Sequence, residues 1–343
     1  MKKLLSMIVL VALLLTVLAG CATTPTTKPG GGTYALIVKN TGNPYNEKEA
    51  EGFEKAVKEF GGTPIVKRPA NPTAEDQIAM INELVSQKVA AIAIAANDVD
   101  ALQPAIKKAM DAGIKVISLD SATNKDSRMT HVQQADPVAI GKVLVEAAYD
   151  MAGGSGDIAI LSATSTATNQ NTWIANMQKL LTEDAKYKDL KLVKIAYGDD
   201  LRDKSVSETE ALLQTYPNLK VIVAPTTVGI AAAAKVVTDK GLTGKVFVTG
   251  LGLPSEMAAY MTEGGACPYM FLWNPIDIGY LAGFTAKAMV DGKTGKVGDV
   301  IPAGTLGSRT IVEATSGDGG TECVLGDPFK FDTKNIAEWK SVY

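Results

Sequence analysis

The sequence has few of the residues that support metal or nucleophilic chemistry. Its 343 residues include one histidine and three cysteines, and no two of these stand at the spacing of a zinc site. The histidine, His131, has no cysteine or serine motif as a partner, so we interpret it as a structural or hinge residue. The sequence therefore argues against a metal centre, and we expect no metal and no cofactor.

Signatures of nucleotide and nucleic-acid binding are missing as well. No GxxxxGK[ST] loop occurs, and the turn after the first expected strand lacks GxGxxG. The glycine-rich stretch 153–156 precedes a strand and does not follow one, which indicates a turn. The 34 basic residues nearly balance the 37 acidic ones, and no basic stripe is present. We therefore expect no nucleic-acid partner.

The one long hydrophobic run lies at the N-terminus. Lys2 and Lys3 precede an apolar run over residues 4–18, which is too short for a spanning helix and typical of a secretory signal. The sequence then reads Leu18-Ala19-Gly20-Cys21, which resembles the bacterial lipobox. That resemblance implies that residues 1–20 are a signal peptide and that the thiol of Cys21 carries diacylglycerol. An ordinary secreted protein with a chance cysteine is the alternative.

The segment after Cys21 is rich in Thr, Pro and Gly, so residues 21–33 are expected to be a lipidated, disordered tether. Several acyl chains would give the stable attachment that a membrane-anchored protein needs. The expected location is therefore outside the cytoplasm, anchored to the cell membrane at Cys21. Cys267 and Cys323 can pair in such a compartment, but the sequence leaves their pairing open.

Residues 34–343 alternate short apolar strands with amphipathic helical segments, and this length exceeds a single core. The chain is expected to form strands at 34–38, 65–66, 90–95, 115–119, 158–161, 190–196, 221–223, 246–249 and 269–273. Helices are expected at 47–60, 74–87, 101–112, 138–151, 172–181, 205–215, 229–238, 255–262 and 278–290, and an extended tail after 291. Continuous apolar strands between helices indicate parallel sheets covered on both faces. The pattern restarts near 130–136, which predicts two doubly wound α/β domains.

Polar and aromatic side chains follow most of these strands. Ligands of open α/β sheets bind beyond the carboxyl ends of the strands, so these positions are the candidate site. They carry mainly amides and hydroxyls, with a lysine, a few carboxylates and aromatic rings. Such groups hydrogen-bond to vicinal hydroxyls, while aromatic faces cover the apolar C–H patches of a sugar ring. The composition of the strand ends favours a small sugar as ligand.

Each of these residues also has a structural alternative. Lys39 can be a solvated lysine at the sheet edge, Asp120 can cap a turn, and Trp273 can belong to the core. An enzyme is a further alternative, with Asp98 and Asp120 as the only carboxylate pair that we nominate. Sugar hydrolysis needs one acid kept protonated, and neither residue shows a basis for that. We therefore predict a binding protein that is not an enzyme.

Several strand-end stretches together resemble type I periplasmic binding proteins, in particular the branch of rhamnose-binding proteins and autoinducer-2 receptors. The most specific are residues 95–98, 161–164, 168–171, 224–229, 249–257 and 272–277. The resemblance covers residues 34–343 and implies two Rossmann-like lobes with doubly wound parallel sheets, joined by a three-strand hinge. The expected N-terminal lobe contains residues 34–131 and 273–308, and the C-terminal lobe contains 132–272 and 309–343.

The resemblance also implies partners. We expect the permease and ATPase subunits of an ABC importer, with the chain itself a monomer. A sugar-responsive transcription regulator shares the fold, but a signal sequence occupies the place of its helix-turn-helix. A chemoreceptor or sensor kinase that reads the closed clamp remains an open alternative.

The family's ligand contacts can be carried over to this sequence. Lys39 and Asp120 stand where autoinducer-2 receptors hold their ligand from one lobe, and Tyr45 stands where an aromatic covers the ring. With the other strand-end residues, the predicted site comprises Lys39, Asn40, Tyr45, Asp120, Asn169, Gln170, Pro225, Thr226, Thr227, Trp273 and Asn274.

Two positions depart from the autoinducer-2 pattern. Asn169 stands where that type carries aspartate, and Thr227 where it carries alanine, and both surrounding stretches are more similar to the rhamnose-binding type. An amide in place of a carboxylate removes an acceptor-only group and adds a donor. We therefore expect L-rhamnose or a similar deoxyhexose, with autoinducer-2 as the alternative ligand.

Overall fold

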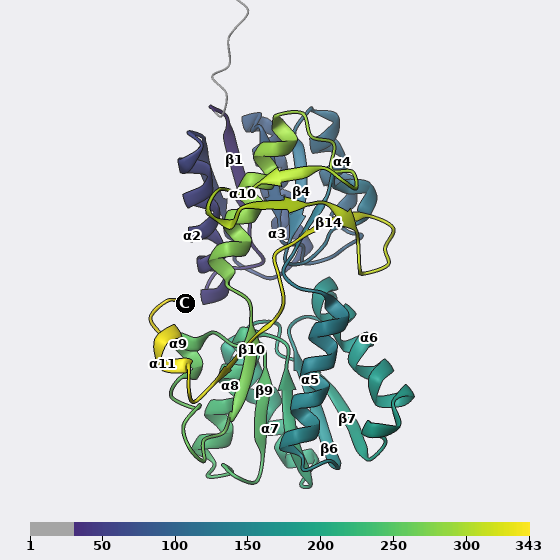
Figure 1. Cartoon of the computed structure of the whole chain (residues 1–343), viewed down its shortest axis with the longest axis vertical. Helices are drawn as coiled ribbons and strands as arrows, with labels where there is room; N and C mark the ends of the chain where they lie inside the picture. The colour runs from purple at the N-terminus through teal and green to yellow at the C-terminus, as the bar shows by residue number, and fades with distance from the viewer. Residues whose placement is uncertain (1–30) are drawn as a thin grey trace, which may run out of the picture. The chain divides into compact units, whose positions relative to one another are not determined.

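A computed structural model describes residues 31–343. The expected signal peptide, Cys21 and nearly all of the expected tether lie outside these residues. Residues 32–343 form one compact unit that contains two main β-sheets with helices packed against them (Figure 1). Within the described range, the helices are all too short or too polar to cross a membrane.

The first sheet has the strand order β13-β14-β5-β4-β3-β1-β2, and all neighbours are parallel except β13 and β14. Its strands are β1 (Thr33–Ile37), β2 (Thr63–Lys67), β3 (Ala91–Ile94), β4 (Lys115–Leu119), β5 (His131–Gln133), β13 (Val312–Glu313) and β14 (Thr321–Val324). Helices α2 (Pro44–Glu59) and α10 (Pro275–Val290) bury their apolar residues in one core of this sheet, and α3 (Ala74–Gln87) and α4 (Gln103–Asp111) in another. Every residue of β3 is buried, as expected of a parallel strand covered on both faces.

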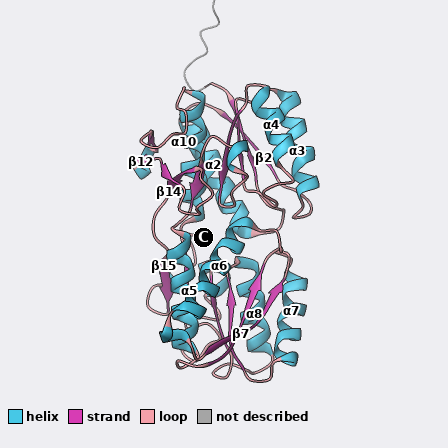
Figure 2. Ribbon diagram, turned by 90° about the vertical axis from the view of Figure 1, so that its right-hand side faces the viewer, coloured by secondary structure: helices cyan, strands magenta, loops and turns pink. Residues whose placement is uncertain are grey.

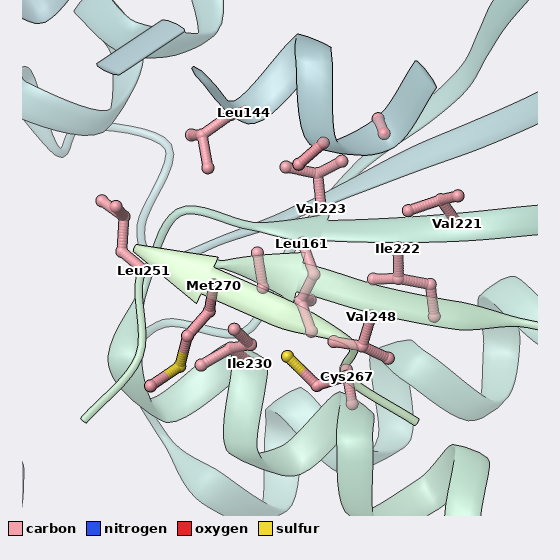
Figure 3. Close-up of a cluster of buried hydrophobic side chains, with 14 of the residues drawn as sticks. Leu144, Leu161, Val221, Ile222, Val223, Ile230, Val248, Leu251, Cys267 and Met270 are labelled. Atoms are coloured by element: carbon pink, nitrogen blue, oxygen red, sulfur yellow. The ribbon is translucent and has the colours of Figure 1, made fainter. Parts of the chain in front are cut away.

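The second sheet is parallel throughout, in the order β7-β6-β8-β9. Its strands are β6 (Gly156–Ser162), β7 (Leu190–Tyr197), β8 (Leu219–Ala224) and β9 (Phe247–Gly250). Helices α5 (Pro137–Met151) and α6 (Thr168–Glu183) pack as one pair, and α7 (Arg202–Thr215) and α8 (Thr227–Asp239) as another (Figure 2). Figure 3 shows the core, where Leu161 and Val223 lie between Leu144 of α5 and Ile230 of α8.

The remaining elements are shorter. They are β10 (Tyr269–Leu272), which pairs with β15 (Phe329–Asp332), the hairpin of β11 (Val300–Pro302) and β12 (Ser308–Thr310), and helices α9 (Pro254–Met257) and α11 (Ile336–Trp339). Single 3-10 turns are η1 (Lys125–Ser127), η2 (Ala185–Tyr187) and η3 (Gly304–Leu306). A bridge between Leu251 and Phe271 places β10 beside the end of β9.

The predicted α/β class with parallel sheets is confirmed. The tail after 291 contains extended segments as expected, but these are strands paired within the fold. Residues after 291 form five strands within the described range, and β14 pairs with β5. The burial of Cys323 against the first sheet holds β14 there. Strand pairing thus places residues 312–324 with the first sheet, whereas the expected range 309–343 assigns them to the C-terminal lobe.

The chain passes between the two sheets three times: between β5 and α5, between β10 and α10, and between β14 and β15. Each pass has its two ends in different sheets or cores (Figure 1). Three passes between the sheets match the expected three-strand hinge.

Helices α2 and α10 approach each other closely because each has a glycine at the contact. A Cβ at Gly52 would lie 1.8 Å from the Ile276 carbonyl oxygen, and one at Gly279 would lie 1.9 Å from the Glu49 carbonyl oxygen. Glycine is the residue that lets two helix backbones come this near. The contact brings the first turn of α2, with Tyr45, beside the start of α10, which follows Trp273.

Candidate functional site

A cavity of about 40 Å³ lies where strand ends of the two sheets come together. Its lining contains all predicted site residues except Asn40 and Asn274. The lining residues are Lys39, Asn43, Tyr45, Asn46, Asp120, Asn169, Gln170, Trp173, Asp200, Pro225, Thr226, Thr227, Leu251, Leu272 and Trp273. Residues that follow β1, β4, β8 and β10 therefore share one cavity, as expected for parallel sheets.

The first-sheet side of the cavity is organised around Asp120, directly after β4. This residue has φ 56°, a left-handed conformation that aspartate and asparagine tolerate better than most residues. Its Oδ1 accepts hydrogen bonds from Gln134 Nε2 at 2.8 Å and from the Tyr45 hydroxyl at 3.3 Å. The Lys39 ammonium lies 3.7 Å from Oδ2. Asp120 is thus held as a buried acceptor with one cation beside it.

The second-sheet side is organised by the first turn of α6. Gln170 Oε1 accepts hydrogen bonds from Ser162 Oγ at 2.6 Å and from the Ala163 backbone N–H at 2.7 Å. These bonds fix the amide and leave its Nε2 group as the donor for the cavity. At the start of α8, the Thr227 hydroxyl also lines the cavity and donates to Asn43 Oδ1 at 3.3 Å.

Hydrogen bonds connect the two sides directly through Asn169. The Lys39 ammonium donates to Asn169 Oδ1 at 3.1 Å, and Asn169 Nδ2 donates to Asp120 Oδ2 at 3.3 Å. All three side chains are more than nine-tenths buried. Groups in such a dry setting need partners, so they would exchange these bonds for equivalent ones to ligand hydroxyls.

Aromatic rings form an apolar wall beside these polar groups. Trp273 Nε1 donates to the Tyr45 hydroxyl at 2.7 Å, and the two rings are perpendicular with centroids 6.4 Å apart. The Trp173 ring lies 5.8 Å from that of Trp273. The wall suits the C–H face of a sugar ring.

Burial controls the ionisation of the acidic groups at the site. It raises the pKa of Asp120, while the neighbouring Lys39 ammonium acts in the opposite direction. The pKa of the Tyr45 phenol is raised well above 10 by burial and then by Asp120, so the hydroxyl remains a donor. Glu49 lies behind the site on α2, fully buried, and burial raises the pKa of its carboxyl well above 4.5. Neither Glu49 oxygen has a hydrogen-bond partner among the described residues.

The two predicted residues outside the lining shape the site from behind. The Asn40 side chain accepts a hydrogen bond from Asn46 Nδ2 at 2.8 Å, and Asn46 lines the cavity in its place. Asn274 caps α10, where its Oδ1 accepts the backbone N–H of Ile276 at 3.0 Å. The side-chain amides of both residues thus bond to neighbouring parts of the chain and do not line the cavity.

Sequence reasoning did not place Asn43, Asn46, Trp173, Asp200, Leu251 and Leu272 in the site. Asp200 comes shortly after β7, so the rule that selected the other strand ends also applies to it. Trp173 lies on the second turn of α6, which begins four residues earlier than expected, so no strand-end rule points to it.

The described part of the chain contains no arrangement that would hold a metal ion. Residues 31–343 contain no group of three or more His, Cys, Asp or Glu side chains that could hold a metal. Asp98 caps the turn after it, accepting the backbone N–H groups of Asp100 and Ala101, and does not line the cavity. Cys267 and Cys323 are buried free thiols that belong to different cores.

Known proteins resemble this chain in sequence and structure. Residues 34–294 match the model of a family described as a periplasmic binding protein domain. An ABC transporter solute-binding protein from Clostridium phytofermentas with bound L-rhamnose is 53% identical, with a TM-score of 0.89, and the match covers 91% of this chain and 99% of that one.

Two less similar relatives have other ligands. LsrB from Clostridium saccharobutylicum, in complex with AI-2, is 25% identical with a TM-score of 0.84, and the match covers 90% of this chain and 99% of that one. The D-allose-binding periplasmic protein of Escherichia coli K12 is 27% identical over 279 residues, which are 78% of this chain and 86% of the relative.

Proposed function

Because the chain belongs to the periplasmic binding protein domain family, we propose that it captures L-rhamnose or a similar deoxyhexose and delivers it to an ABC permease. The chain is an extracytoplasmic sugar-binding component of such an importer and is not an enzyme. The choice of L-rhamnose rests on the 53% identity with a protein that holds this sugar, together with the polar set around Asp120.

Asn169 is the observation that favours a neutral sugar over autoinducer-2. Its amide accepts from the Lys39 ammonium and donates to the Asp120 carboxylate at the same time. An aspartate at this position could accept from Lys39 but would place a second carboxylate against Asp120. An amide can therefore bond to both Lys39 and Asp120, which supports the prediction that position 169 lacks the carboxylate of the autoinducer-2 type. AI-2 remains the second candidate because the AI-2-bound relative shares the fold at 25% identity.

The binding step requires the two sides of the cavity to separate. A volume of about 40 Å³ holds roughly three water molecules, which is too little for a hexose ring. We propose that the two sheets, each with its helices, are lobes that open to admit the sugar and close around it. Closure is favoured when the sugar bonds to Asp120 on one lobe and Gln170 on the other.

We also propose that residues 1–20 are removed and that the chain is attached to the membrane through lipid on Cys21. The tether would then end at residue 31, because β1 begins at Thr33. The receptor would act as a monomer that presents its closed form to the permease, which works with an ATPase subunit.

The test is a calorimetric titration of residues 31–343 with L-rhamnose, AI-2, D-allose and D-ribose, in parallel with tryptophan fluorescence. We expect saturable one-to-one binding that is tightest for L-rhamnose, a fluorescence change that Trp273→Phe diminishes, and full recovery of the unchanged sugar. A ligand at a thousand times its Kd adds about 4 kcal/mol to the stability. If none of the ligands shifts the melting temperature, the assignment of a sugar is wrong. If only AI-2 does so, the second candidate replaces the first.

A further inference from the structure

Asp200 is the one carboxylate that the second-sheet side presents to the cavity within the described range. The other lining residues on that side are uncharged, since position 169 is an asparagine. On the first-sheet side, the charged lining residues are Lys39 and Asp120. The described part of the chain therefore lines the cavity with two carboxylates, one from each side, and with one cation.

The turn after β7 holds Asp200 beside the end of β6. The Gly198 N–H donates to the Ser162 carbonyl oxygen at 2.8 Å, and the Asp199 N–H donates to the Ala163 carbonyl oxygen at 3.1 Å. Asp199 and Asp200 both have left-handed backbones, with φ 54° and 53°. Most residues avoid this conformation, while aspartate and asparagine tolerate it. The backbone thus restricts position 200 to a few residue types.

The two oxygens of the Asp200 carboxylate differ in their surroundings. Oδ1 accepts a hydrogen bond from the Thr226 hydroxyl. Oδ2 has no hydrogen-bond partner within residues 31–343, and no lysine or arginine there forms an ion pair with Asp200. Unlike the enclosed oxygens of Glu49, Oδ2 keeps accessible surface. The bond from Thr226 therefore fixes the carboxylate and leaves one oxygen free to accept from a ligand.

The Asp200 carboxylate interacts with the charges of the first-sheet side. Burial raises the pKa of Asp200, and the Lys39 ammonium is the strongest influence in the opposite direction. Asp200 in turn adds to the effect of burial in raising the pKa of Asp120. Lys39 already lies 3.7 Å from Asp120 Oδ2, so this one ammonium cannot neutralise both carboxylates. The free oxygen of Asp200 is therefore available to a hydroxyl donor.

We propose that Asp200 is a specificity-determining residue, which accepts a hydrogen bond from one hydroxyl of the bound sugar while Asp120 accepts from another. This inference rests on the proposed function, because the ligand is taken to be a deoxyhexose. An ionised carboxylate only accepts, so each of the two needs its own donor. The ligand must then carry two correctly placed hydroxyls, one for each side. A sugar that lacks the hydroxyl for Asp200 leaves this acceptor unpaired in the closed form.

The experiment is a calorimetric titration of residues 31–343 with L-rhamnose and with its four analogues that lack the hydroxyl at C1, C2, C3 or C4. Asp200→Asn keeps the left-handed conformation and the acceptor for Thr226, and it replaces the free acceptor by a donor. Asp199→Asn is the matched control, because Asp199 has the same backbone conformation, pairs with Lys204 and does not line the cavity. Each variant is compared with itself across the sugars, so a general change in stability does not alter the pattern.

We expect Asp200→Asn to weaken L-rhamnose binding about tenfold and Asp199→Asn to leave it within about twofold. The analogue without the hydroxyl for Asp200 should bind the wild-type protein about tenfold more weakly than L-rhamnose does, and Asp200→Asn should weaken it no further. The other analogues should lose affinity on this substitution as L-rhamnose does. Unchanged L-rhamnose affinity of Asp200→Asn, or an equal loss for all four analogues, overturns the proposal and leaves the proposed function intact. A failure of L-rhamnose to bind the wild-type protein contradicts the proposed function and the extension together.

Discussion

At the scale of single residues, Asp120 links conformation to recognition. Its left-handed backbone limits the residues that can replace it, and its carboxylate contacts Gln134, Tyr45 and Lys39 at once. Alanine at this position would combine backbone strain with loss of the acceptor. Asparagine keeps the conformation and the shape, so it isolates the role of the charge.

We expect Asp120→Asn to weaken L-rhamnose binding by about tenfold or more, since a buried acceptor lost from a hydrogen-bonded set costs about 1–3 kcal/mol. Asp199→Asn is the matched control, because Asp199 also has a left-handed backbone, with φ 54°, and pairs with an exposed lysine, Lys204. Calorimetric titration measures both. Equal affinity of the two variants would remove Asp120 from the site.

Glu49 gives a pH dependence with a definite sign. The carboxyl has an ordinary pKa of 4.5, and burial raises it well above that in the folded chain. Between the two values the folded chain holds a proton that the unfolded chain has released, so stability falls as the pH rises. Glu49→Gln removes this dependence without changing the shape.

We therefore expect the stability gained by Glu49→Gln to be larger at pH 8 than at pH 4, as measured by urea unfolding at both. Glu75→Gln, at an exposed position on α3, is the control for the general loss of a carboxylate. A difference in unfolding free energy that is the same at both pH values contradicts this account of Glu49.

Residue identity and strand-end position were enough to find most of the candidate site, because parallel sheets collect their carboxyl ends at one edge. They could not distinguish a side-chain amide that lines the cavity from one that bonds to the neighbouring chain. Asn40 and Asn46 differ only in which of them faces the cavity, and that choice depends on where α2 begins. Trp173 was missed because its position depends on the start of α6.

At the scale of elements, the contact between α2 and α10 positions the aromatic wall. Both helices enter the site at their N-terminal turns, and the distance between them is set by Gly52 and Gly279. Alanine inside a helix normally stabilises it by roughly 0.5–1 kcal/mol relative to glycine. Here the added methyl group would clash with the Glu49 carbonyl oxygen, so overpacking outweighs the gain.

We expect Gly279→Ala to destabilise the protein by about 1–3 kcal/mol and to weaken sugar binding, because it pushes Tyr45 away from Trp273. Gly326→Ala is the control, since a Cβ there meets nothing within 4 Å. Urea unfolding and titration with L-rhamnose measure the two effects. Unchanged stability of Gly279→Ala would show that the helix contact is not as close as described.

The sequence predicted strands correctly where apolar runs were long, and it missed strands whose partners are far away in the sequence. The buried strands β3 and β8 were evident from their composition. By contrast, β14 has four residues, and its partner β5 lies far from it in the sequence. No local pattern records such a pairing, so the sequence indicated an extended tail without its strand partners.

At the scale of the whole molecule, function depends on two sheets that share one cavity and on the chain's place in the cell. We expect full-length protein to partition into the detergent phase when it is produced in a bacterium that processes lipoproteins. Cys21→Ser should shift it to the aqueous phase while leaving sugar affinity unchanged, because Cys21 lies outside the binding unit. Detergent partitioning by Cys21→Ser would contradict the lipid anchor.

The most direct test of the account is a crystal structure of residues 31–343 grown with L-rhamnose. The account predicts one sugar ring in the cavity, hydrogen-bonded to Asp120 and Gln170 and resting against Trp273, with Asn169 turned to the ligand. A ring bound to only one of the two sheets, or bound outside this cavity, would contradict it.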